Sequence, residues 1–353
     1  MIGADPYAAR GYQVLKLETH LHTRHSDGQH GVTEMLAACR MAGYDAVALT
    51  DHNTQSGLDE AVEAAARLGL ILLPGVEVTT FSGHAVVLGV TRVPEWRDLE
   101  SRGMAALVDE VHSAGGLVCV AHPTALGSPV CSGCTWDWQV NPTAIDLWEI
   151  FSAPRPHTAA PLALWRQLLA AAGRVAPVAA GDVHSVEAAA RSRHATYVYV
   201  DHPTAQSVLD ALRRGRLFAA AESRLDFWLE AADGSVAVVG ERVAAGENGC
   251  RGYHRRRRLS AVSRLLTGPN ACTPSCVTLR LDWRPSPPRS GSRRPLDATP
   301  AYARSTSEST CRQVADHGPG LAWRRQARAR ETAQARADGP RHDMLRQHRR
   351  VKW

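Results

Sequence analysis

Histidines and acidic residues recur in short, regularly spaced groups along the first half of the chain. The first group pairs His20 with His22 and is followed by Asp27, and a later group pairs Asp182 with His184. Side chains two residues apart on a β-strand point to the same face, so each pair can reach one metal ion. Imidazole and carboxylate ligands without thiolate favour Zn, Mn or Fe over Mg or Ca. The pattern therefore predicts a centre of divalent metal ions.

Other candidate ligands lie next to separate apolar runs. Asp51 and His52 are adjacent, and neighbouring strand residues point to opposite faces, so we expect only His52 to face the metals. The full predicted ligand set is His20, His22, Asp27, His52, Glu77, His84, His122, Asp182 and His184. We interpret the remaining histidines considered as loop or core residues, namely His25, His30, His112, His157, His194 and His202.

The elements that must position these residues alternate between strand and helix patterns. Apolar runs predict strands at 14–19, 46–50, 71–78, 85–90, 117–121, 145–150, 178–180 and 196–200. Amphipathic segments predict helices at 32–42, 58–68, 99–114, 159–172 and 205–214. This alternation indicates an α/β fold with a parallel sheet, and seven or eight such units suit a barrel. Functional residues of such barrels gather at the carboxyl ends of the strands, where most of the candidates lie; His84, at the start of its strand, is the exception.

The charge of the chain is divided unevenly between its two ends. Residues 251–353 hold 23 Lys and Arg against 7 Asp and Glu, whereas residues 1–250 hold 18 against 28. The overall pI near 9.0 therefore belongs to the tail. It does not predict that the whole chain binds nucleic acid.

The tail also lacks the apolar periodicity of the preceding sequence. It is rich in Arg, Pro and Ser, and such a segment cannot bury enough apolar surface to offset its chain entropy. We expect a disordered tail or an out-of-frame reading of a GC-rich gene, rather than a basic nucleic-acid arm. The predicted organisation is a metallohydrolase domain at 1–230, the start of a truncated β extension at 231–250, and this tail at 251–353.

Several other protein classes have no signature in the sequence. No continuous apolar run reaches ~18 residues and no secretion signal is evident, so we expect a cytoplasmic protein without a membrane span. Phosphate-binding loops and serine-hydrolase elbows are both missing. The lone C-x-x-C of Cys131 and Cys134 lacks the further ligands of a zinc site, so we expect a loop with two thiols.

The motifs together resemble the PHP family, the polymerase and histidinol phosphatase superfamily, over about residues 14–230. The resemblance implies a distorted (β/α)7 PHP-type barrel. Two runs, at 79–84 and 127–138, are similar to the carbaryl hydrolase-like branch of the family. The motifs that carry the resemblance are His20-x-His22 with Asp27, Thr50-Asp-His52-Asn, Gly75-x-Glu77, His84, Ala121-His122-Pro and Gly181-Asp182-x-His184.

The resemblance also implies how the nine ligands are shared among two or three divalent ions. The first ion would be held by His20, His22, Glu77 and Asp182. Glu77 would bridge to a second ion held with His84 and His122. A third ion, where present, would be held by Asp27, His52 and His184.

Three functions remain open from the sequence. The first is a phosphoesterase that acts on a small phosphoester or a nucleic-acid 5′ end, as a phosphatase or exonuclease, with a metal-bridged hydroxide as the nucleophile. The second is a carbamate or carboxylic ester hydrolase with the same metal site, and the third is a non-catalytic module or nucleic-acid binder. The predicted catalytic residues are Asp182, His184 and Glu77, and the predicted substrate-binding residues are Asn53, Arg155 and Arg191. The sequence does not indicate an oligomeric state.

Overall fold

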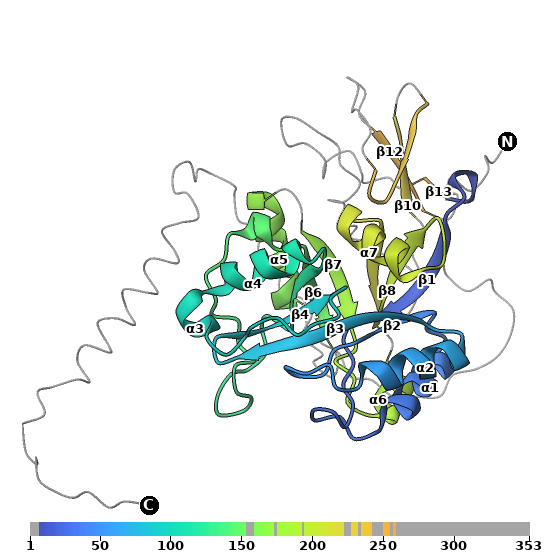
Figure 1. Ribbon diagram of the computed structural model, residues 1–353. Helices are drawn as coiled ribbons and strands as arrows, with labels where there is room; N and C mark the ends of the chain where they lie inside the picture. Colours follow the sequence, from blue (N-terminus) through green and yellow to red (C-terminus); the bar gives the residue numbers. More distant parts are fainter. Residues whose placement is uncertain are drawn as a thin grey trace, which may run out of the picture. The chain divides into compact units, whose positions relative to one another are not determined.

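The computed structural model describes residues 7–152, 159–172, 175–192, 194–221, 227–231, 234–241, 250–254 and 257–258. Within these residues, one large mixed sheet curls into a barrel (Figure 1). Its strands, in chain order, are β1 (Gln13–Glu18), β2 (Ala46–Leu49), β3 (Ile71–Thr80), β4 (Gly83–Leu88), β5 (Leu117–Val120), β6 (Leu147–Ser152), β7 (Ala176–Ala180), β8 (His194–Val200) and β9 (Leu217–Ala221).

The two ends of this sheet approach each other, so the barrel is nearly closed. The strand order is β7-β6-β5-β4-β3-β2-β1-β8-β9. The Thr196 hydroxyl of β8 accepts a hydrogen bond from the Ala179 backbone N–H of β7 at 2.9 Å and donates to the Ala179 carbonyl at 3.0 Å. The α/β barrel predicted from the sequence is confirmed.

The prediction of a parallel sheet is wrong for two of the predicted strands, β4 and β8. β1, β2 and β3 pair in parallel, as do β5, β6 and β7, but β4 runs antiparallel to both β3 and β5. Only Phe81 and Ser82 connect β3 to β4, and a parallel crossover needs a dozen or more residues. β8 likewise runs antiparallel to both of its neighbours, β1 and β9, so β9 has the same direction as β1. Because β4 is reversed, its amino end lies beside the carboxyl ends of its neighbours.

Two groups of helices, α1 with α2 and α6, and α3 with α4 and α5, lie beside the barrel, whereas α7 lies apart and packs into the core formed by the barrel strands (Figure 1). Apolar residues of α1 recur at the spacing of one helix face, and with α2 and α6 they pack against β2. The predicted helix at 99–114 is divided at Gly103, whose φ of +82° is not helical. The helices are η1 (Ala8–Arg10), α1 (Val32–Met41), α2 (Leu58–Leu68), α3 (Leu99–Arg102), α4 (Met104–Ser113), η2 (Pro142–Ala144), α5 (Ala159–Ala172), α6 (Val186–Arg191) and α7 (Ala205–Arg214). In the described part of the chain, none of them combines the length and apolar character needed to cross a bilayer.

A second, antiparallel sheet follows the barrel in the chain. It has the order β11-β10-β12-β13. Its strands are β10 (Phe227–Ala231), β11 (Val236–Val238), β12 (Cys250–His254) and β13 (Arg257–Arg258). Regular β-structure therefore extends past residue 250, where the sequence analysis placed the start of the tail. Residues 259–353 lie outside the described residues, so the prediction for the tail is untested.

Candidate metal centre

The ends of β1 and β7 bring the two spaced pairs together. Beyond the regular strands, Leu21 and Val183 form a parallel bridge. The His22 N–H donates to the Val183 carbonyl at 2.8 Å, and the Val183 N–H donates to the His20 carbonyl at 3.1 Å. This short extension of the sheet places the H-x-H pair beside Asp182. Its carboxylate Oδ1 lies 3.5 Å from His20 Nε2 and 3.4 Å from His22 Nε2.

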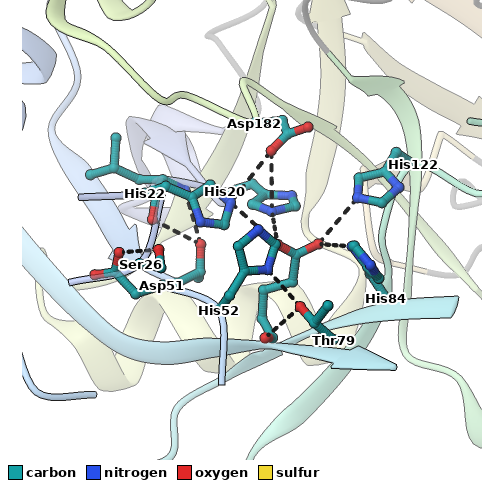
Figure 2. Close-up of polar contacts among 12 residues, drawn as sticks. His20, His22, Ser26, Asp51, His52, Thr79, His84, His122 and Asp182 are labelled. Atoms are coloured by element: carbon teal, nitrogen blue, oxygen red, sulfur yellow. Dashed lines mark hydrogen bonds and ion pairs between the residues drawn. The ribbon is translucent and has the colours of Figure 1, made fainter. Parts of the chain in front are cut away.

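The end of β2 separates the adjacent Asp51 and His52 as predicted. His52 turns to the centre, whereas the Asp51 carboxylate turns away from it (Figure 2). Asp51 accepts hydrogen bonds from the Thr23 N–H at 2.7 Å and the Ser26 hydroxyl at 2.6 Å. Asp51 therefore holds the loop that carries Asp27.

Glu77 lies at the middle of the centre, and its two carboxylate oxygens face different imidazoles. Oε1 is 3.1 Å from both His84 Nδ1 and His122 Nε2. Oε2 is within 3.0–3.2 Å of a ring nitrogen of each of His52, His20 and His22. His84 reaches this point from the start of β4, because that strand is reversed. A carboxylate with separate ligand sets on its two oxygens has the geometry of a bridge between two cations.

A third set of ligands lies toward solvent. Asp27 Oδ1 is 3.3 Å from His184 Nε2 and 3.7 Å from His22 Nδ1, and Asp27 Oδ2 is 3.6 Å from His52 Nε2. The side chains of Asp27, His52 and His184 are 56%, 25% and 32% exposed, whereas those of His20, His22 and Glu77 are 0% exposed. All nine predicted ligands are thus brought together, in a buried part and an exposed part.

The charges of the cluster shift the pKa values of its members in the direction of ion pairing. Burial alone would lower the pKa of a histidine, but the nearby carboxylates of Asp27 and Glu77 outweigh it and raise the pKa of His52 to about 10. Burial likewise opposes the raised pKa of His20, which Glu77, Glu149 and Asp182 hold well above its usual value. The cluster therefore stabilises positive charge, which bound protons or metal cations can supply.

The residues of this cluster fit divalent metal ions. His20 Nε2, both ring nitrogens of His22, Glu77 Oε2 and His122 Nδ1 are buried and make no hydrogen bond. Buried polar atoms are normally hydrogen-bonded, so these atoms are available as ligands to bound cations. Ligand atoms within 4.8 Å of one another form four overlapping groups, which are His20, His22 and Asp182; His52, Glu77 and His84; His22, Asp27, His52 and His184; and His84, His122 and Cys134.

Several imidazoles are oriented from behind by an oxygen acceptor. His20 Nδ1 donates to Glu149 Oε1 at 2.8 Å, and His184 Nδ1 donates to the Asp182 carbonyl at 2.9 Å. The second ring nitrogen of each is then left with its lone pair toward the cluster, which is the usual arrangement of metal-binding histidines. Glu149 Oε2 also accepts a hydrogen bond from the backbone N–H of His122 at 2.6 Å. One buried carboxylate therefore positions ligands on both sides of Glu77.

Two supporting acids, Glu149 and Glu18, were not among the predicted site residues. Glu149 interrupts an apolar run in β6, and a lone acid in a buried strand is the signal that could have identified it. Glu18 ends β1, which also contains Gln13 and Lys16, so it carries no such signal. Glu18 accepts from the backbone N–H groups of His20 at 3.1 Å and Gly181 at 2.7 Å. Burial raises the pKa of Glu18 to about 7.

The predicted substrate-binding residues are placed less clearly than the ligands. The Asn53 side chain is hydrogen-bonded to Thr79, since its amide donates to the Thr79 carbonyl at 3.0 Å and its oxygen accepts from the Thr79 N–H at 2.9 Å. Arg191 is exposed at the end of α6. Arg155 lies outside the described residues. A substrate contact remains a prediction for all three.

The expectation that Cys131 and Cys134 are two free thiols is wrong. The structure joins them in a disulfide. A C-x-x-C spacing permits such a bond, and the sequence alone does not show whether the loop brings the sulfurs together.

Comparison with known proteins agrees with the PHP resemblance. Residues 18–121 match the family model described as PHP domain. The chain is 40% identical over 65 residues to a 5′-3′ exoribonuclease of Haemophilus influenzae, a match that covers 18% of this chain and 24% of the relative. It is 41% identical over 78 residues to a 3′,5′-nucleoside bisphosphate phosphatase of Chromobacterium violaceum, covering 21% of this chain and 27% of the relative. The chain thus spans about a quarter of the length of these relatives.

Solved structures include a two-domain protein of Bacteroides vulgatus described as containing a predicted PHP-like metal-dependent phosphoesterase. The two chains are 20% identical, with a TM-score of 0.49, and the match covers 60% of this chain and 66% of that one.

Proposed function

We propose that this protein is a metal-dependent phosphoesterase. The observation that carries the proposal is the position of Glu77, whose two oxygens face separate imidazole sets 3.0–3.2 Å away. Two or three divalent ions of Mn, Zn or Fe fit these ligands. When bound, such ions activate water as a nucleophile and neutralise charge on a phosphoryl group. The chain then has to hold the ions, balance their charge and move protons.

The charge balance of the proposed ligands favours an anionic substrate. The acids among them are Asp27, Glu77 and Asp182, which contribute three negative charges. Two divalent ions contribute four positive charges, and three contribute six. The resulting net positive site suits a phosphate ester better than a neutral ester.

Asp182 is the residue that we assign to proton transfer. Its Oδ1 lies within 3.5 Å of His20 and His22, and its side chain is 10% exposed, at the boundary between the buried ligands and solvent. A carboxylate at this boundary can take a proton from the attacking water and pass it outward. His184, whose Nδ1 bonds the Asp182 backbone, is the next group on the path to solvent.

The names of two matching relatives give the substrate classes to test first. One is an exoribonuclease and the other a nucleoside bisphosphate phosphatase. We therefore propose a small phosphoester, such as a nucleotide, or a nucleic-acid 5′ end as the substrate. We keep the predicted cytoplasmic location as part of this proposal.

A carbamate or carboxylic ester hydrolase is the second candidate. One observation favours it: the edge of the centre next to His84 is apolar. Phe81, between β3 and β4, is 84% exposed, and Trp136 and Trp138 lie against Gly83. Such an edge suits an aryl ester, in agreement with the resemblance to the carbaryl hydrolase-like branch.

A substrate panel distinguishes the two candidates. Protein loaded with Mn²⁺ or Zn²⁺ would be assayed with an aryl phosphate, a nucleoside 3′,5′-bisphosphate, a 5′-phosphorylated oligonucleotide, and an aryl ester and aryl carbamate. We expect turnover of the phosphoesters. Turnover of only the ester or carbamate would overturn the phosphoesterase proposal, and a metal-loaded protein inactive on every substrate would support a non-catalytic module.

Two histidine variants accompany that panel, one in a proposed metal ligand and one as its control. His20→Ala is expected to lower bound metal and to abolish phosphoester turnover, because His20 is buried among the ligands. His202→Ala is the matched control, since His202 is an exposed loop residue. Full metal content and activity in His20→Ala would contradict the assignment.

A further inference from the structure

The Cys131–Cys134 loop lies against the His84 and His122 side of the centre. Cys134 is 3% exposed, and its Sγ belongs to a group in which the ligand atoms of His84, His122 and Cys134 lie within 4.8 Å of one another. Two free cysteines, Cys39 and Cys119, are buried in the apolar core instead. The sulfur of Cys134 is therefore placed among proposed metal ligands, and the function proposed above gives it no role.

Contacts other than the disulfide fix the position of this loop. His84 Nε2 donates to the Ser132 carbonyl at 3.2 Å. A Cβ at Gly133 would meet the Thr80 carbonyl oxygen, so only glycine fits where the loop touches β3. The Thr135 hydroxyl donates to the Ala125 carbonyl at 3.0 Å. These contacts do not involve either sulfur, so we expect Cys134 to stay beside the histidines when the disulfide is reduced.

The adjoining ligand set supplies three donors, one fewer than a tetrahedral site takes. Glu77 Oε1, His84 Nδ1 and His122 Nε2 supply three atoms, with both nitrogens 3.1 Å from the oxygen. Cys134 Sγ lies within 4.8 Å of the ligand atoms of His84 and His122. Tetrahedral sites for zinc-like ions take four ligands, often with thiolate among them. A thiolate from Cys134 would complete such a set.

We propose that Cys134 is a redox-controlled ligand of the cation held by His84 and His122. The proposal rests on the metal centre proposed above. In the reduced protein the Cys134 thiolate binds the cation. In the oxidised protein the same sulfur is bonded to Cys131 and is withheld from the cation.

An external dithiol supplies the two electrons that reduce the Cys131–Cys134 disulfide. A thiolate of the dithiol attacks Sγ of Cys131, which is the more exposed of the two sulfurs. The S–S bond breaks, and its electron pair leaves on Cys134 as a thiolate. The second thiol of the dithiol then displaces Cys131, so the dithiol becomes a disulfide and Cys131 becomes a thiol. The Cys134 thiolate binds the cation, and the second proton of the dithiol goes to solvent.

Cobalt binding tests this proposal without depending on turnover. Co²⁺ bound by thiolate has a charge-transfer absorption in the near ultraviolet, which imidazole and carboxylate ligands do not produce. The full-length metal-free protein would be titrated with Co²⁺ after reduction and after oxidation, together with Cys134→Ser and Cys131→Ser. Bound cobalt would be counted by elemental analysis in each case.

We expect the absorption in reduced wild type and in Cys131→Ser under either redox condition. It should be lost in Cys134→Ser and in oxidised wild type, with at least a tenfold weaker cobalt affinity at this group. Equal spectra for reduced wild type and Cys134→Ser, with cobalt bound in both, would overturn the thiolate ligand and leave the metal centre intact. Failure of the reduced wild-type protein to bind cobalt at all would overturn the metal centre itself. Cys131→Ser also removes the disulfide but keeps Cys134. Its spectrum therefore separates loss of the ligand from a folding defect caused by loss of the disulfide.

Discussion

The buried and exposed parts of the centre differ in how the chain supports them. His20, His22 and Glu77 are fully buried, and Glu149 orients His20 from behind. Asp27 is 56% exposed and lies in a loop that Asp51 holds through Thr23 and Ser26. A ligand set with buried supporting acids is preorganised, whereas a loop ligand pays ordering entropy on binding. We therefore expect the proposed centre to bind an inner pair of ions tightly and an outer ion more weakly.

Glu77→Gln should have the largest effect, because Glu77 is the one ligand that faces both inner sets. Loss of its charge removes the bridge, and metal-ion catalysis is worth several kcal/mol, so we expect kcat to fall by at least about 10³-fold. Elemental analysis should show the loss of both inner ions. Glu63→Gln, on an exposed side chain of α2, is the control. An active variant with two ions would mean that Glu77 is not the bridge.

The sequence predicted which side chains converge because the relevant information is local; their role as metal ligands stays a prediction. The H-x-H and D-x-H pairs follow from strand alternation, and their position at strand ends follows from barrel architecture. His84 is at the start of its strand and still reaches the other candidates, because β4 is reversed. The two-residue connection between β3 and β4 could have indicated this reversal.

The contacts of the supporting residues could not be predicted from the sequence, because they join segments that are distant along the chain. Glu149 reaches His20 only through the register of β6, 129 residues away along the chain. Cys134 reaches the histidines through the path of an irregular loop. Neither register nor loop path is set by local pattern, whereas periodicity and strand-end position are.

Glu149→Gln should have the next largest effect and tests whether the inner set depends on its support. The amide keeps the size of the side chain but loses the charge that holds His20 and the His122 N–H. Loss of such a supporting contact typically costs about 10–100-fold in metal affinity or activity. Titration with a fluorescent competitor for Zn²⁺ would measure the affinity, and circular dichroism would check the fold. Unchanged affinity would show that the strands alone hold the inner ligands.

Stepwise removal of metal compares the two parts directly. We expect a graded series of chelator concentrations to remove the outer ion first, with apparent affinities at least about tenfold apart, since solvent-exposed ligands must be ordered on binding. Elemental analysis after each step should show a plateau at two ions before complete loss. Loss of all ions in a single step would contradict the division into an inner and an outer part.

Asp27→Asn should have the smallest effect, confined to the outer ion. Burial opposes the lowered pKa of Asp27, but the nearby imidazoles of His184 and His52 outweigh it, so the carboxylate is the negative charge between the outer histidines. The variant should bind one ion fewer, keep both inner ions and lose less than about tenfold in kcat, a loss of under 1.4 kcal/mol. Asp59→Asn, an exposed acid of α2, controls for general charge effects. A loss as large as that of Glu77→Gln would mean that the exposed ion takes a direct part in the reaction, and the inner and outer ligands would then form a single three-metal catalytic unit.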